Sequence, residues 1–210
     1  MIVDEETRSD RKRRAILEAA TSVFLNKGYG GSSVDEIAAV AAVSKQTVYK
    51  HFKDKEQLFT AIVLATTTDV DELVRLVADT LADTTDLEKD LGNLARQFIN
   101  TLMQPRLLRL RRLIIANAER LPEVARLWFE RGFERVLKTL ASCFQQLTER
   151  KLLRLDDPLL AAHHFVGLLL WIPINKAMFS GNDKSSTKTD LAKYADAAVS
   201  VFLAAYGRRR

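Results

Sequence analysis

Apolar residues recur along most of the chain at the three- and four-residue spacing of an amphipathic α-helix. No alternation of apolar and polar residues persists long enough to indicate a β-strand. The first helical stretch begins near Asp10 and ends at Gly28, because glycine commonly stops a helix. Its inward positions are Ile16, Ala20, Val23 and Phe24. The pattern therefore predicts an all-α protein that opens with one long helix.

Two short helices joined by a tight turn are expected next. Residues 33–36 read Ser-Val-Asp-Glu, the pattern of a capping box, in which the serine hydroxyl and the glutamate carboxylate each accept from a free backbone amide. A second helix should follow to about Val40. Residues 41–43 form a turn, and Ser44 caps a third helix that runs through Lys50. A short helix pair behind a longer supporting helix is typical of a helix-turn-helix.

The rest of the chain continues as helices. A fourth helix is expected from Asp54, with inward positions as far as Val77, and residues 180–186 have the composition of a loop. Longer helices are expected near residues 87–103, 106–118, 122–150, 157–179 and 188–206, which makes about nine in all. We expect a three-helix DNA-binding domain over residues 1–55, with the fourth helix leading out of it from about residue 54. Residues 56–210 should form a second helical domain.

Composition adds a location for the charge. The chain has 210 residues and a net charge of +5, and residues 8–55 hold ten basic and five acidic side chains. The remainder holds 22 of each, so the whole excess lies in the first quarter of the chain. A local excess of this kind is typical of a module that binds a polyanion, although a solvated surface with chance asymmetry would look the same.

Several protein classes are not expected. The N-terminus is acidic where a secretory signal is basic, and the most apolar stretch is interrupted by Pro173, so we expect a cytoplasmic protein without a membrane partner. No glycine-rich phosphate loop, metal-ligand cluster or nucleophile elbow is recognisable in the sequence. We therefore expect neither an enzyme nor a cofactor or metal site, and the lone Cys143 excludes an internal disulfide.

The polar side of the third helix carries residues suited to reading DNA. A helix fits the major groove, and its first residues meet base edges there. Lysine can donate to guanine and glutamine can pair with adenine, so Lys45 and Gln46 are the expected base readers. Tyr49, one turn later, should reach a phosphate. The expected DNA-binding residues are Ser32, Ser33, Ser44, Lys45, Gln46, Thr47, Tyr49, Lys50, Lys55, Arg11 and Arg14.

Residues 16–59 strongly resemble the TetR family of bacterial transcriptional regulators. The likeness rests on Tyr29, on residues 33–38 and 43–52, and on Lys-Glu-Gln-Leu-Phe at 55–59, all in this order. Ala42 stands where the family often has glycine before the valine of the turn. The resemblance implies an all-α homodimer with a C-terminal ligand-binding domain, and phosphate contacts by Tyr49, Lys55 and the start of the second helix.

The second half resembles the AefR-like C-terminal domain of some family members. This likeness rests on residues 112–123 and on Asp-Asp-Pro at 156–158, and it names no ligand. The TetR family resemblance implies that the last helix and the helix near 157–179 pair with their two-fold mates in a four-helix interface. The last helix has an apolar stripe, from which the expected interface residues are Tyr194, Ala195, Ala198, Phe202 and Tyr206.

The central helices are rich in aromatic and long apolar residues, and two interpretations stay open. They line a pocket for an apolar or amphipathic effector, or they are ordinary core. The candidate pocket residues are Phe98, Met103, Ile114, Asn117, Trp128, Phe129, Phe133, His163, Phe165 and Trp171.

The working hypothesis is a ligand-responsive transcriptional regulator with three partners: double-stranded operator DNA, a small-molecule effector and a second copy of the chain. Repression of a palindromic operator, relieved by the effector, is the expected mode, and activation stays open. The alternative is a helical small-molecule-binding or protein-interaction module that does not bind DNA. Salt-dependent binding to duplex DNA separates the two hypotheses.

Overall fold

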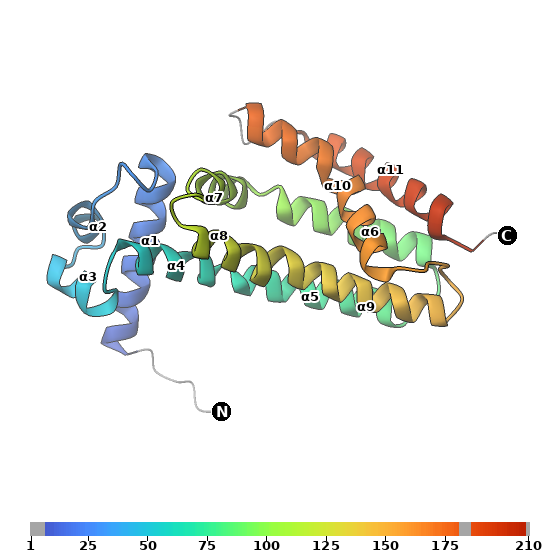
Figure 1. Ribbon diagram of the computed structural model, residues 1–210, viewed down its shortest axis with the longest axis horizontal. Helices are drawn as coiled ribbons and strands as arrows, with labels where there is room; N and C mark the ends of the chain where they lie inside the picture. The colour runs from blue at the N-terminus through green and yellow to red at the C-terminus, as the bar shows by residue number, and fades with distance from the viewer. Residues whose placement is uncertain (1–6, 181–185, 209–210) are drawn as a thin grey trace. The chain divides into compact units, whose positions relative to one another are not determined.

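The computed structural model describes residues 7–180 and 186–208, which form helices joined by short turns and loops (Figure 1). The only β-type pairing described is a single bridge between Leu153 and Gly207. The all-α prediction is therefore confirmed. The elements are α1 (Arg8–Lys27), α2 (Val34–Val40), α3 (Lys45–His51), α4 (Lys55–Ala65), α5 (Thr67–Ala82), α6 (Leu87–Leu102), α7 (Pro105–Ile115), α8 (Pro122–Trp128), a π-helical segment (Phe129–Glu134), α9 (Arg135–Glu149), α10 (Pro158–Ser180) and α11 (Lys188–Tyr206).

Some helix boundaries differ from the expected ones. The fourth helix is interrupted at Thr66, whose buried hydroxyl donates to the Val63 carbonyl at 2.6 Å. The helix expected over 122–150 is divided by the π-helical segment. The helix expected over 106–118 ends at Ile115, since tighter turns follow there. Residues 181–185 of the expected loop lie outside the described residues.

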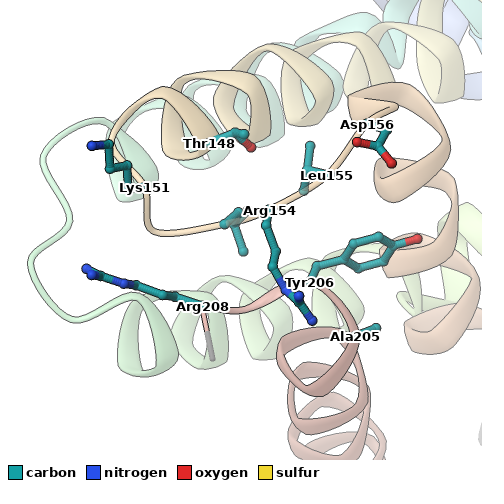
Figure 2. A pocket seen from close by; sticks show the side chains of 9 residues that line it. Thr148, Lys151, Arg154, Leu155, Asp156, Ala205, Tyr206 and Arg208 are labelled. Carbon is teal, nitrogen blue, oxygen red and sulfur yellow. The ribbon is translucent and has the colours of Figure 1, made fainter. Parts of the chain in front are cut away.

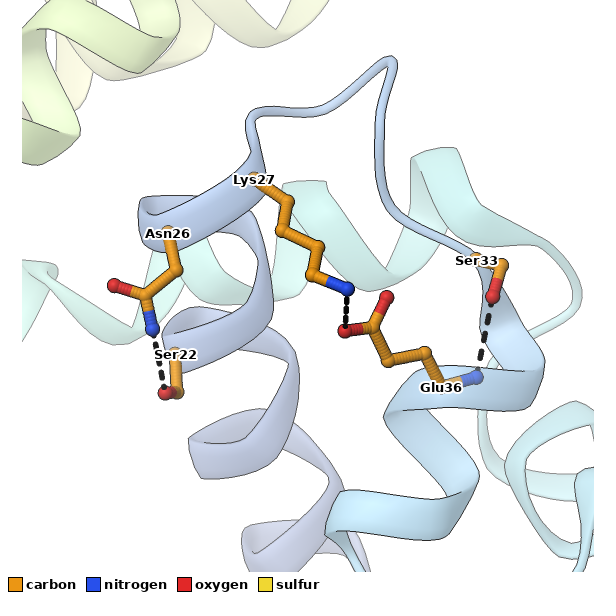
Figure 3. Close-up of polar contacts among 5 residues, drawn as sticks. All are labelled: Ser22, Asn26, Lys27, Ser33 and Glu36. Carbon is orange, nitrogen blue, oxygen red and sulfur yellow. Dashed lines mark hydrogen bonds and ion pairs between the residues drawn. The ribbon is translucent and has the colours of Figure 1, made fainter.

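Local capping explains where the N-terminal helices begin. The Ser33 hydroxyl accepts from the Glu36 amide at 3.2 Å, and the Ser44 hydroxyl accepts from the Thr47 amide at 3.1 Å. The other half of the expected capping box is wrong: the Glu36 carboxylate pairs with the Lys27 ammonium at 2.6 Å (Figure 3). Lys27 ends α1, so this ion pair joins the supporting helix to α2 instead of completing a cap.

The turn between α2 and α3 explains the position where the family favours glycine. Ala42 has a φ of 52°, in the left-handed region that is costly for a residue with a Cβ atom. The Val43 amide donates to the Ala38 carbonyl at 3.0 Å, which closes the turn. The backbone of this turn therefore favours glycine, and the chain accepts alanine at some cost in stability.

The described chain forms two compact units. The first contains the described residues up to Thr67 together with Leu110–Trp128, and the second contains Thr68–Arg109 and the described residues from Phe129 onward. The boundary expected after residue 55 differs from this division. Leu58 and Phe59 of α4, and Leu121 and Val124 near α8, are buried in the same core as α1 to α3. The apolar face of α4 therefore belongs to the first unit.

Each unit has its own core. In the first, Ile16 and Phe24, which the spacing of the first helix predicts to point inward, pack with Ile37 and Val48 and so bring α1, α2 and α3 together. In the second, α10 packs on α9 and α11, and α11 packs on α6. Phe144, Phe165 and Phe202 meet at the centre of the second core, with ring centroids 5.0–5.8 Å apart.

Candidate DNA-binding surface

The third helix presents its polar side to solvent, as the sequence predicts. Val48 is 1% exposed and anchors α3 in the core of the first unit. Lys45, Gln46, Tyr49 and Lys50 are exposed, and Tyr49 keeps 46% of its surface accessible although it is a large aromatic residue. An exposed phenol beside lysine and glutamine on a short, capped helix provides donors for both bases and phosphates.

Lys45 has a partner that local sequence patterns did not reveal. Its ammonium donates to the Asp35 carboxylate of α2 at 2.9 Å, and both side chains are exposed. This hydrogen bond, together with the negative charge of Asp35, raises the pKa of Lys45. Asp35 lies ten residues earlier in the chain, so only the packing of α2 against α3 brings the two together. The positive charge of Lys45, the first residue of α3, is therefore balanced by a neighbouring carboxylate.

The loop before α2 uses two of the expected DNA-binding residues internally. Ser32 is 6% exposed and its hydroxyl donates to the Tyr29 carbonyl at 2.8 Å, so in this structure the hydroxyl is used within the loop and is not presented to a phosphate. The Lys55 ammonium donates to the carbonyls of Tyr29 at 2.7 Å and Ser32 at 2.9 Å. Partial burial lowers the pKa of Lys55. Lys55 therefore clamps the loop before α2 through these two hydrogen bonds, and it also contributes a positive charge.

The arginines of α1 remain outside the core. Arg11 and Arg14 are exposed, and Arg14 approaches Glu18 at 3.9 Å, the loosest ion pair described on this helix. The Arg13 guanidinium lies 5.4 Å from the centroid of the Phe52 ring, so Arg13 contacts the residue that ends α3. Ser33, Ser44 and Thr47 complete the expected set: the two serines are exposed caps, and Thr47 is half-buried.

The expected pocket residues do not form one lining. Ile114, Asn117 and Trp128 belong to the first unit, and the other seven belong to the second. The seven are Phe98, Met103, Phe129, Phe133, His163, Phe165 and Trp171. Phe98, Met103, Phe165 and Ile114 are buried core side chains, in agreement with the interpretation as ordinary core.

Two of these residues point to solvent instead. Trp171 is 73% exposed and Phe129 is 46% exposed, so their expected place in an enclosed pocket is wrong for this chain alone. Phe129 and Phe133 have ring centroids 5.6 Å apart, and Phe133 lies 6.5 Å from the exposed His163. Asn117 donates one of its two side-chain N–H groups to the Leu113 carbonyl at 2.8 Å.

A cavity of about 750 Å³ does occur in the second unit, at the ends of α9 and α11 (Figure 2). It is open to solvent, and none of its lining residues is one of the expected pocket residues. They are Thr148, Lys151, Leu153, Arg154, Leu155, Asp156, Ala205, Tyr206 and Arg208. Within residues 7–180 and 186–208, no group of three or more histidine, cysteine or acidic side chains is placed to hold a metal ion.

Comparison with known proteins identifies the family. Residues 16–62 match the family model of bacterial regulatory proteins of the tetR family, and residues 89–208 match that of the AefR-like transcriptional repressor C-terminal domain. The chain belongs to the TetR family. A TetR-family transcriptional regulator from Mesorhizobium loti has 52% sequence identity, with 96% of this chain and 100% of that chain covered and a TM-score of 0.89.

More distant relatives match in structure or in part of the sequence. The flavonoid-responsive regulator FrrA is 28% identical, with a TM-score of 0.74 over 95% of this chain and 99% of its own. The transcriptional activator FasR of Mycolicibacterium smegmatis is 37% identical over 91 residues, which cover 43% of this chain and 40% of FasR. The chain thus aligns with less than half of the length of the first curated relatives it matches.

The expected dimer residues require correction. Ala195, Ala198 and Phe202 are at most 3% exposed and lie in the core of their own unit, so they cannot form an outer surface of the second unit. The stripe on α11 is the side that faces α6 and α10. Tyr194 accepts a hydrogen bond from Lys176 at 3.0 Å, and Tyr206 shares one with His164 at 2.5 Å, so both join α11 to α10.

The outer side of α10 is apolar as well. The exposed apolar side chains on this side are Leu160, Leu168, Trp171, Ile172 and Phe179, between 39% and 87% exposed, whereas the exposed Leu159 lies on a different side of the helix. By length and composition α10 could cross a membrane, but Ala161, Phe165 and Leu169 on its other side are fully buried in the second core. Exposed apolar side chains that lie together on one side of a helix are typical of an interaction surface.

Proposed function

We propose that the chain is a DNA-binding, ligand-responsive transcriptional regulator that acts as a homodimer. The observation that carries the proposal is the exposed polar side of α3, with Gln46, Tyr49 and Lys50 held outward by buried Val48. Family membership and the local excess of positive charge support it. Gln46 and Lys45 would meet base edges, and the Tyr49 hydroxyl would donate to a phosphate.

The remaining contacts would position the domain on the phosphate backbone. Ser33 and Ser44 cap the two short helices, Thr47 and Lys50 lie on α3, and Arg11 and Arg14 extend the surface along α1. Lys55 would contribute its positive charge through the loop that it clamps. These contacts carry no sequence information themselves, so specificity would depend on Gln46 and Lys45.

Dimerisation would use the outer side of α10. Association of two copies about a two-fold axis would cover Trp171 and its apolar neighbours, which otherwise stay in water. Two recognition helices related by such an axis would read a palindrome with half-site centres about 34 Å apart or more. The chain's own core residues, Ala195, Ala198 and Phe202, would support this surface from beneath rather than form it.

Repression is the mode we propose, with release by a small apolar or amphipathic effector. The AefR-like C-terminal domain is named for a transcriptional repressor, whereas FasR is an activator, so the direction of regulation needs its own test. FrrA is flavonoid-responsive, which makes planar aromatic compounds a reasonable first class to screen. The effector would act only through its preference for one conformer.

Selection of bound fragments from genomic DNA tests the proposal. The full chain should retain fragments that share a palindrome, and their affinity should fall steeply as salt rises, because bound phosphates release counterions. Scrambled fragments of equal length serve as the control. Equal, weak retention of both kinds of fragment at every salt concentration would favour the alternative, a helical binding module without a DNA partner.

A further inference from the structure

Tyr29 occupies a central place in the first unit. It lies in the loop between α1 and α2 and is 5% exposed, and its ring packs against Phe24 and Phe59 with centroids 5.7 and 5.4 Å away. Two cations also lie over this ring. The Lys55 ammonium is 4.4 Å from its centroid and the Arg120 guanidinium is 5.3 Å from it. One aromatic side chain thus joins three segments that are distant in sequence.

Lys55 connects this ring to the loop that leads into α2. Its ammonium donates to the Tyr29 and Ser32 carbonyls, and these two bonds use two of its three N–H groups. Ser32 immediately precedes Ser33, the N-cap of α2. The position of Lys55 therefore determines how the loop, the start of α2 and the start of α4 are held together.

Arg120 reaches the same ring from the segment between α7 and α8. Leu121, the next residue, is 5% exposed, and its amide donates to the Asn117 carbonyl at 2.8 Å. Val124 of α8 is also buried in the core of the first unit, and α8 packs on α4. Arg120 is therefore carried by a segment that is itself anchored beside the DNA-binding helices.

The two cations influence one another across the ring. Burial, and after it the positive charge of Arg120, lowers the pKa of Lys55. The negative face of an aromatic ring attracts both cations, which is the reason they can share it. A shift of the turn that holds Arg120 would change the attraction on the ring and the repulsion on Lys55 together.

We infer that Arg120 is a positioning residue for DNA binding, which acts through the Tyr29 ring on Lys55 and the loop at the start of α2. This inference rests on the proposed DNA-binding function and adds to it a route by which the α7–α8 segment affects the DNA-binding surface. The route consists of contacts within the first unit alone.

Substitution of Arg120 tests the inference in the full chain. Arg120→Met removes the charge and keeps much of the side-chain length, whereas Arg120→Lys keeps a cation over the ring. Arg126→Met is the matched control, since Arg126 lies on α8 and pairs with Glu123 at the surface. We expect Arg120→Met to weaken binding to a genomically selected fragment about fivefold, and the other two variants to stay within about twofold of the original chain.

A spectroscopic measurement separates positioning from a loss of folding. The pKa of Lys55, followed by NMR on ¹³Cε-labelled lysine and assigned with Lys55→Arg, should rise in Arg120→Met and stay unchanged in Arg126→Met. Circular dichroism checks that each variant is folded. Unchanged DNA affinity in folded Arg120→Met would overturn the inference whatever the Lys55 pKa, and a loss of affinity with an unchanged Lys55 pKa would overturn the route through Lys55.

Failure of the proposed function gives a different result. If the original chain shows no salt-dependent binding to any selected fragment, the DNA-binding proposal fails for every variant. A rise in the Lys55 pKa would then still be measurable in Arg120→Met, and the contact would be real but without a role in DNA binding, which also overturns the inference.

Discussion

Lys45 and Asp35 show how a single acidic residue can limit a DNA-binding surface. Lys45 is the first residue of α3, and its ammonium is bound to the carboxylate of Asp35 before any DNA is present. If Lys45 contacts DNA as proposed, its ammonium exchanges this carboxylate for a base or a phosphate, and the carboxylate then lies close to the negative backbone. The free energy gained by a non-specific contact is therefore reduced, while a well-placed base contact can still compensate.

Asp35→Asn should accordingly strengthen binding to random duplex DNA and reduce the preference for a selected fragment. If Lys45 gains one phosphate, the slope of log affinity against log salt should steepen by about 0.9. Fluorescence anisotropy at several salt concentrations measures both effects. Asp79→Asn on α5 removes the same charge from another exposed position and is the control. Identical slopes in the two variants would mean that Asp35 does not restrain Lys45 on DNA.

Tyr49 is the residue whose proposed role is easiest to isolate. Tyr49→Phe removes only the hydroxyl from a side chain that is 46% exposed, so stability should change little. Affinity should fall about fivefold per half-site for selected and scrambled DNA alike, since a phosphate contact carries no sequence information. Gln46→Ala should instead relax the preference at one base position. Unchanged affinity in Tyr49→Phe would exclude the phosphate contact.

Among the secondary-structure elements, the bounds of the N-terminal helices could be predicted from the sequence, whereas the breaks within helices and the contacts between them could not. The caps at Ser33 and Ser44 and the inward positions of α1 agree with the sequence pattern, because both depend on residues within one or two turns. The interruption at Thr66 and the π-helical segment carry no comparable local signal. Glu36 also departed from its expected cap, because Lys27 of another helix offered a stronger partner.

The turn between α2 and α3 gives a stability prediction. Ala42→Gly should raise the free energy of unfolding by about 1 kcal/mol, because glycine tolerates the left-handed backbone at φ 52°. Ala39→Gly, at an exposed position near the end of α2, should lower it by up to about 1 kcal/mol. Thermal or urea unfolding followed by circular dichroism measures both. Destabilisation by both substitutions would contradict the strain assigned to Ala42.

At the scale of the whole molecule, the exposed side of α10 is the feature that a single chain leaves incomplete. Large apolar side chains such as Trp171 and Phe179 remain in water on a helix whose opposite side is fully buried. The sequence pattern of α10 is apolar all round, so it could not separate the side facing the core from the side facing a partner. For α11 the pattern identified one stripe, which the chain itself covers.

Trp171→Glu should therefore leave the helical fold intact and shift the chain from dimer to monomer at micromolar concentration. The charge would have to be buried without a partner in the two-fold contact, which is costly. Sedimentation velocity measures the change. Ile115→Glu places the same charge at another exposed apolar residue, 59% accessible at the end of α7, and should leave the association unchanged. A monomeric original chain would contradict the proposed dimer itself.

The helical class, the two capped helices with the polar side of α3, and the family could all be predicted from the sequence. Each of them depends on residues that lie within a few positions of one another in the chain. Three contacts became visible only in the tertiary structure: the ion pair of Asp35 with Lys45, the hydrogen bonds of Lys55 to the loop before α2, and the position of Arg120 over the Tyr29 ring. The tertiary structure also decided which apolar stripe is core and which is surface. Such contacts follow from the packing of whole helices, and a periodic pattern says only that a helix has an apolar side, not what covers it.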